Sequence, residues 1–143
     1  MKNLEDTFET LSEERCRDLL ASRQLGRVAF AIGGQPEIMP VNYAVDGAVI
    51  VFRTAPETKL AQSPLSRVAF EVDHWDPVLQ SGWSVVVKGV AQDVTKAIDP
   101  FASALRSRKV VPAAPGERET WIAIYPSEIT GRSFRRWVGD TKT

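Results

Sequence analysis

Apolar and polar residues alternate along most of the chain from residue 27 onward. Apolar side chains recur at every second position in short segments, and turn-forming residues such as Gly33–Gly34 separate these segments. A period of two is typical of β-strands that bury one face. We therefore expect six strands, over residues 28–32, 38–45, 48–54, 67–72, 84–94 and 121–125, with a further ordered segment over 131–137.

A segment near the N-terminus has helical spacing instead. Cys16, Leu19 and Leu20 lie at positions i, i+3 and i+4, which places them on one face of a helix. Thr10 and Glu13 fit a capping box, in which each side chain satisfies a free amide at the helix start. The spacing predicts a short amphipathic helix that packs against a larger element.

The order of elements predicts a mainly β fold. A second helix is expected over residues 97–108, and the six strands follow one another mostly through short loops. This arrangement favours a six-stranded antiparallel barrel with short flanking helices. A length of 143 residues fits one domain. We expect a single domain over 1–143, with residues 1–9 and 138–143 loosely held.

Asp46–Gly47 is a strong hairpin signal, because a tight two-residue turn needs positive φ angles. If these two residues form the turn, Tyr43 lies opposite Ile50. The alternation of the two strands then assigns four apolar residues to the core face: Val41, Tyr43, Ile50 and Phe52.

The opposite face of this hairpin carries polar groups. Counting from the turn places Asn42 and Arg53 as diagonal neighbours, and Lys59 follows soon after the strand ends. An amide, a guanidinium and an ammonium group close together could bind an oxyanion or a phosphate. The structural alternative is an arginine that extends its charged end from the strand end into water.

The strand expected over 84–94 is apolar on both faces in its middle. A strand of this kind is covered on both sides. A barrel of this size needs a helix or a second subunit to supply the outer cover, and we favour a homodimer interface.

Composition excludes several classes of function. The chain has 18 Lys+Arg and 18 Asp+Glu residues, so its formal net charge is zero, whereas nucleic-acid-binding domains usually carry a basic excess. One Cys and one His cannot form a disulfide or a zinc site. The start of the chain is polar and acidic, and no segment approaches the roughly 18 apolar residues of a membrane span. We expect a cytoplasmic protein without metal, nucleic acid or membrane as partner.

A series of short motifs is shared with a known family. In chain order they are Gly26-Arg27-Val28-Ala29-Phe30, Pro40-Val41-Asn42-Tyr43, Phe52-Arg53-Thr54 with Thr58-Lys59-Leu60, Val68 to Asp73, Gly82 to Gly89, and Ile129-Thr130-Gly131-Arg132. The series resembles the pyridoxamine 5′-phosphate oxidase-like family of FMN-binding split β-barrels, and in particular its short, nitroimidazole-resistance-type members. The resemblance covers about residues 10–135.

The resemblance implies a homodimer with two FMN sites at the subunit interface. It assigns the flavin phosphate to the segment that includes Arg53, Thr54, Thr58 and Lys59. It places Pro40, Val41 and Asn42 beside the isoalloxazine ring. It implies that the partner subunit presents a strand beginning at Trp83 and Ser84, and that Arg132 is a late basic residue near the site.

The resemblance also implies a function. We expect an FMN-dependent oxidoreductase that passes electrons from a reduced donor through the flavin to a small oxidised acceptor. The alternative is a binding protein of the same fold that holds a flavin, a deazaflavin or haem without turnover. Glu57 favours the alternative, because a carboxylate beside a phosphate is repulsive. No side chain stands out in the sequence as an essential acid or base.

Several residues have two interpretations. His74 is either a solvent-facing loop residue or a haem ligand or proton donor, and Cys16 is interpreted as a buried, inert thiol. Trp83 could stack on the flavin or pack in the core or dimer interface. The basic segment 132–136, next to Trp137, could contact an anion or single-stranded nucleic acid, and the neutral chain favours the anion.

Overall fold

The computed structural model describes residues 7–56, 58, 60–61, 65–108, 110 and 120–136. Its elements follow the order β1 (Thr7–Thr10), α1 (Glu13–Ala21), β2 (Leu25–Ile32), β3 (Gln35–Asp46), β4 (Val49–Thr54), β5 (Leu65–Asp76), β6 (Ser81–Asp93), α2 (Pro100–Arg106) and β7 (Thr120–Arg135). Neither helix of the described part is long and apolar enough to span a membrane.

The strands form one antiparallel sheet that closes on itself. The strand order is β1-β7-β4-β3-β2-β5-β6, and an additional pairing joins β6 to β7. Six strands therefore complete a ring, as the sequence predicted, and the fold class of an antiparallel split barrel with two short helices is confirmed. The seventh strand, β1, pairs with the end of β7 outside the ring. The sequence did not predict β1, because four exposed residues give no alternation signal.

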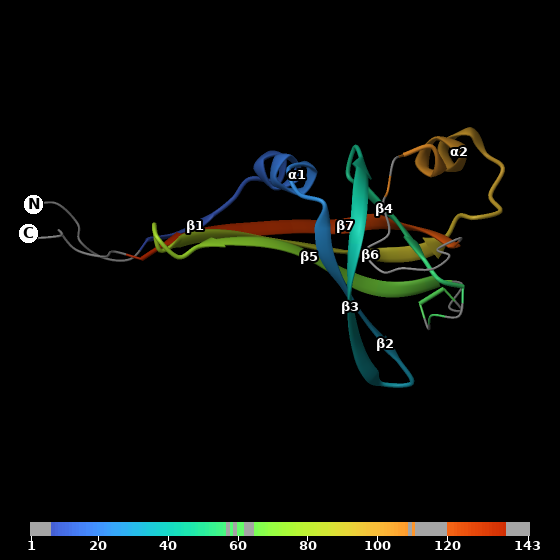
Figure 1. The fold of residues 1–143 in the computed structure, drawn as a ribbon, viewed down its shortest axis with the longest axis horizontal. Helices are drawn as coiled ribbons and strands as arrows, with labels where there is room; N and C mark the ends of the chain where they lie inside the picture. Colours follow the sequence, from blue (N-terminus) through green and yellow to red (C-terminus); the bar gives the residue numbers. More distant parts are fainter. Residues whose placement is uncertain are drawn as a thin grey trace, which may run out of the picture.

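Three strands are longer than the barrel needs. Strands β5, β6 and β7 run side by side along the long axis of the molecule (Figure 1). The segments 73–76, 81–84 and 132–135 extend with β1 beyond the ring, and we name this extension the arm. The strand β7 joins two segments that the sequence separated. The β6–β7 ladder shifts register between Lys88 and Gly89, as at a β-bulge.

The hairpin between β3 and β4 has a different register from the predicted one. Asp46 stays in the ladder opposite Val49, so the turn consists of residues 47–48 and Tyr43 lies opposite Phe52. Gly47, with φ of +62°, occupies the first turn position. The predicted pairing of Tyr43 with Ile50 is wrong by two residues. The faces keep their assignment, because a shift of two preserves the alternation.

Two apolar clusters hold the fold together. The first fills the barrel interior and includes the four residues predicted for the core: Val41, Tyr43, Ile50 and Phe52. The second lies on the outer side of β4 and β7, where α2 covers Val51 and Ala123 with Ala102 and Leu105. Strand β4 is therefore buried on both faces.

Helix α1 closes one side of the barrel. Cys16, Leu19 and Leu20 are buried in the first cluster, as predicted. The predicted cap is wrong by two residues: the Ser12 hydroxyl accepts the Arg15 N–H at 3.1 Å. Thr10 cannot cap the helix because it pairs with Arg132 in the β1–β7 ladder.

Candidate functional site

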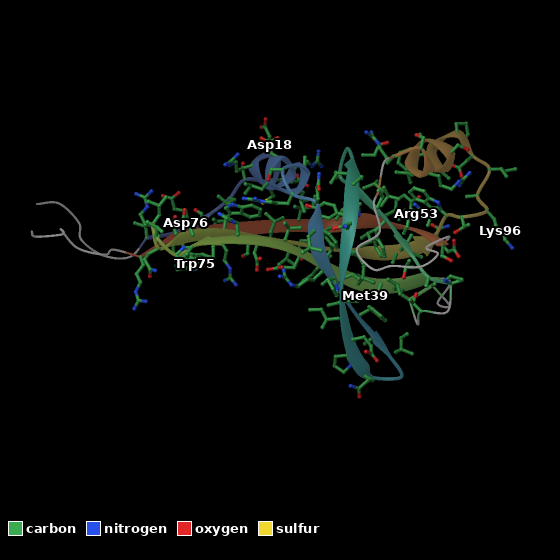
Figure 2. The ribbon with its side chains drawn as sticks, viewed as in Figure 1. Asp18, Met39, Arg53, Trp75, Asp76 and Lys96 are labelled. Atoms are coloured by element: carbon green, nitrogen blue, oxygen red, sulfur yellow. The ribbon has the colours of Figure 1, made fainter. Side chains whose placement is uncertain are left out.

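Arg53 and Thr54 are the last two residues of β4, where the chain leaves the sheet. The half-buried Arg53 places its guanidinium carbon 5.3 Å from the centre of the Trp121 ring, its ladder partner on β7. This stacking orients the cation at the strand end. Figure 2 shows Arg53 at the end of the molecule that carries α2.

A turn of hydroxyl groups follows Arg53 directly. The hydroxyl of Thr54, which is only 5% exposed, donates to the Thr58 hydroxyl at 3.2 Å. The Thr58 hydroxyl donates to the Ala55 carbonyl at 3.0 Å and accepts the Ala61 N–H at 3.3 Å. These bonds fix a compact turn beside a guanidinium group. Glu57 and Lys59 lie outside the described residues.

Asn42 lies in a separate pocket between α1 and β3, which we name the Asn42 pocket. It has a volume of about 290 Å³, and its polar side chains include Asn42, Arg23 and Gln24. Asn42 is half-buried and pairs with Leu25, while its neighbour Val41 points into the barrel core. Val41 can therefore offer a ligand only its backbone. Pro40, the next predicted residue, is exposed.

Tyr43 forms the inner wall of the Asn42 pocket. Its hydroxyl donates to the Leu20 carbonyl at the end of α1. Burial raises the pKa of Tyr43 to about 12, so the phenol stays neutral. This bond fixes α1 against β3 and keeps the shape of the pocket.

Trp83, Ser84 and Arg132 lie on the other side of α1, where the barrel continues into the arm. Trp83 faces His74 and Ser133 across the sheet, and the Arg23 guanidinium lies 5.7 Å from its ring centre. Ser84 and Arg132 are direct ladder partners, one position along. Successive residues of a strand point to opposite faces, so Ser84 and Arg132 share the outer face of the sheet, opposite Trp83.

In one chain, the predicted residues that the structure describes do not line one common cavity. The β3–β4 ladder ends at Tyr43 and Phe52, so Asn42 and Arg53 share a face of the sheet but do not line one pocket. Trp83 belongs to a third pocket, in the arm, with His74 and Arg135. The hairpin count predicted a common pocket for Asn42 and Arg53, and the structure keeps them on one face but assigns Asn42 to a separate pocket.

Sequence reasoning missed Arg23. Its side chain lines the Asn42 pocket and lies on Trp83, and so connects two of the predicted positions. Nothing in the helical stripe of α1 indicated it, because Arg23 follows the helix. Only the packing of α1 across β3 and β6 brings it there.

A second unpredicted group lies on the outer face of β2 and β5. Arg27 contacts the Glu71 carboxylate at 3.2 Å and the Asp73 carboxylate at 3.5 Å. Partial burial raises the pKa of Glu71 to about 7. A hydrogen bond that the protonated Glu71 donates to the Asp73 carboxylate and the negative charge of Asp73 act in the same direction, while Arg27 opposes them. The alternation of β5 places the two carboxylates on one face, but only the register with β2 shows that they share one arginine.

The remaining candidates behave as follows. His74 belongs to β5 rather than to a loop, and it is exposed. Cys16 is fully buried, and burial raises the pKa of its thiol, in agreement with an inert structural role. Arg132 is exposed and lies 5.5 Å from the Phe8 ring centre.

Trp137 is outside the described residues. Within the described ranges, no group of three or more His, Cys, Asp or Glu side chains could hold a metal ion.

The chain is similar to proteins of known sequence and structure. An uncharacterised protein of Mycobacterium tuberculosis is 35% identical over 139 residues, which are 93% of this chain and 88% of that protein. A solved FAD-binding protein of Mycobacterium smegmatis is 36% identical, with a TM-score of 0.71 over 88% of this chain and 98% of that chain. A Corynebacterium glutamicum protein described as a pyridoxamine 5′-phosphate oxidase is 32% identical, with a TM-score of 0.77 over 98% of both chains.

The sequence model of one family covers nearly all of the described fold. It is the model described as pyridoxamine 5′-phosphate oxidase, and it matches residues 12–133. This match runs from the Ser12 cap of α1 through the ring of six strands to the arm end of β7. The chain belongs to the pyridoxamine 5′-phosphate oxidase family.

Proposed function

We propose that this protein binds a flavin and acts as a flavin-dependent oxidoreductase on a small-molecule acceptor. The observation that carries the proposal is the end of β4, where Arg53 is held on Trp121 beside the turn of Thr54 and Thr58. The M. smegmatis relative, at 36% identity, is an FAD-binding protein, which supports a flavin as the ligand class. FMN is the smallest flavin with the required phosphate.

The donor set at this place suits a phosphate. A guanidinium donates paired N–H groups to phosphate oxygens, and threonine hydroxyls add uncharged donors. Lys59, which the family resemblance also assigns to the phosphate, would add a second charge. The Asn42 amide and the indole of Trp83 are suited to a polar, planar ring system. A bound flavin supplies hydride and electron transfer, while the protein supplies orientation and electrostatics.

A second copy of the chain would complete the site. Arg53 and Asn42 share a face of the β3–β4 hairpin, whereas Ser84 and Arg132 lie together on the outer face of the arm. In a two-fold dimer, the arm of each copy would meet the β3–β4 side of the other, and both sites would form at once. We therefore propose a homodimer with two shared sites.

The purified protein tests the proposal by its visible spectrum and by titration with flavin. We expect an oxidised-flavin spectrum, or saturable binding of added FMN or FAD at micromolar concentration. Arg53→Ala should weaken binding by about 1.5–3 kcal/mol, the range for a charged hydrogen bond. Arg17→Ala is the matched control, because Arg17 is an exposed arginine paired with Glu13 on α1.

Three results would count against the proposal. A Soret band with no flavin binding would favour the alternative of a haem protein, and binding of a deazaflavin alone would favour the third cofactor. Equal flavin affinity of Arg53→Ala and the native chain would remove Arg53 from the phosphate site.

A further inference from the structure

Arg23 gives the Asn42 pocket a positive charge. The other polar side chains that line this pocket are the amides of Gln24 and Asn42 and the neutral phenol of Tyr43. No carboxylate among the described residues lines it. A pocket that is lined by a cation and by no anion favours a ligand, or a state of a ligand, that carries negative charge.

The charge of Arg23 is not neutralised by a neighbouring carboxylate in the part of the chain that the structure describes. Arg27 is the contrast, because it contacts the carboxylates of both Glu71 and Asp73. No such ion pair forms at Arg23 within the described ranges. The side chain of Arg23 is exposed, so water screens its charge and limits the effect on a ligand.

Two contacts fix where the charge of Arg23 acts. The guanidinium carbon lies 5.7 Å from the ring centre of the half-buried Trp83. The charge also reaches the inner wall of the Asn42 pocket: burial is the main cause that raises the pKa of Tyr43, and the positive charge of Arg23 opposes it. Arg23 is therefore in reach of both groups that the proposed function assigns to the flavin ring, the Asn42 amide and the Trp83 indole.

The charge of a flavin ring differs between its two redox states. Transfer of a hydride to a neutral ring adds two electrons and one proton, and so adds one negative charge. A nearby cation stabilises the charged state more than the neutral state, and charge beside the ring is one means by which a protein tunes a flavin. Arg53 differs from Arg23 in this respect, because the proposed phosphate contact is the same in both states.

We propose that Arg23 stabilises the reduced state of the bound flavin and thereby raises its reduction potential. The inference rests on the proposed flavin site, because a ring beside Asn42 and Trp83 is what places the flavin next to Arg23. It adds a division of labour between two arginines: Arg53 would hold the cofactor, and Arg23 would set the balance between its redox states.

The test measures the midpoint potential of the bound flavin, by equilibration with redox dyes, in the native chain and in Arg23 variants. Arg23→Gln should reduce the preference for the reduced state by about tenfold, which lowers the potential by about 30 mV for a two-electron couple. Arg23→Lys keeps the charge and should retain most of the native potential. Arg17→Gln is the matched control, since Arg17 is an exposed arginine on α1, paired with Glu13.

The native chain offers a second measurement that needs no variant. Because Arg23 is exposed, salt should screen its charge, and the potential should fall as ionic strength rises from about 0.01 M to about 1 M. Circular dichroism checks that each variant folds.

Three results would overturn the inference. The first is an equal potential of Arg23→Gln and the native chain, and the second is an Arg23→Lys potential as low as that of Arg23→Gln, because the charge would then have no effect. The third is loss of both flavin states in Arg23→Gln, which would make Arg23 a binding residue without preference. Failure of the native chain to bind flavin would instead overturn the proposed function, so the two failures are distinguishable.

Discussion

Strands β4 and β6 have the same kind of sequence and different surroundings. Both are apolar on both faces in their middle. On β4, α2 covers the outer face, and Val51 is 0% exposed. On β6, Val85 and Val87 point into the core, but Val90 remains 37% exposed on the outer face. A strand that is apolar on both faces predicts a cover on its outer face. Among the described residues, α2 provides this cover for β4, whereas Val90 on the outer face of β6 stays 37% exposed.

The outer face of β6 carries a shallow apolar pocket. Ala29, Ala69 and Val90 line a shallow pocket of about 510 Å³ there, with Arg67 and Lys88 at its edge. Small side chains on neighbouring strands leave room for residues of a partner. This surface supports the proposed homodimer, and the following predictions test the difference between the two strands.

The largest expected effect is at the cover of β4. Leu105→Ala removes a fully buried side chain from α2 and leaves a cavity against Val51. The free energy of unfolding should fall by about 2–5 kcal/mol, measured by urea denaturation. Phe101→Ala on the same helix is the control, since Phe101 is exposed and contacts only the Tyr125 ring at 6.4 Å among the ring pairs described. If both variants cost the same, α2 is not the structural cover of β4.

A substitution on the outer face of β6 should affect dimer assembly rather than the folding of the single chain. Val90→Glu places a charge on the outer face, and should change the stability of the single chain by no more than about 0.5 kcal/mol. Sedimentation should then show a shift from dimer to monomer. Ile98→Glu is the control, because Ile98 is 94% exposed in the loop between β6 and α2, away from the arm. If the protein remains a dimer after Val90→Glu, the dimer interface does not include this face of β6.

The smallest effect concerns the carboxylates beside the outer face. The pKa of Glu71 is about 7 in the folded chain, above its ordinary value of 4.5. The folded state therefore binds more protons than the unfolded state between these values, and stability should fall as pH rises from about 5 to about 8. Solvent screening limits the change to about 1 kcal/mol.

Glu71→Gln should flatten this pH dependence, measured as urea midpoints between pH 5 and pH 8. Asp18→Asn on the exposed face of α1 is the control and should leave the slope unchanged. A slope that persists in Glu71→Gln would show that another group carries the dependence.

The sequence was sufficient for the ring of six strands and for the core faces, but not for β1 or for the full length of β7. Alternation assigns Val41 and Phe52 to the core whatever the exact turn, since a shift of two residues preserves the faces. The turn itself was misplaced, because glycine satisfies a positive φ at either turn position, and only the ladder shows that Asp46 pairs with Val49. Local sequence patterns therefore predict which face of a strand is buried better than they predict which residues pair across two strands.

The candidate site was predicted in part as an assembly. Arg53, Thr54 and Thr58 are close in sequence, so their grouping was visible, and in the structure hydrogen bonds fix the two threonines. The hairpin count also grouped Asn42 with Arg53, but Asn42 lies in a separate pocket. Arg23 lies near Asn42 and Trp83 only through the packing of α1. Contacts across the sheet carry no signal in a single sequence.

The position of β7 has a consequence for how the protein reaches its fold. This strand comes last among the described elements, and it pairs with β1, β4 and β6. Without β7 the ring is open, and β4 and β6 both present free edges on which other chains could pair. Closure thus joins residues distant in the chain, a topology associated with slow folding. During synthesis the barrel stays open until β7 has left the ribosome, and this interval is when the chain is most exposed to aggregation.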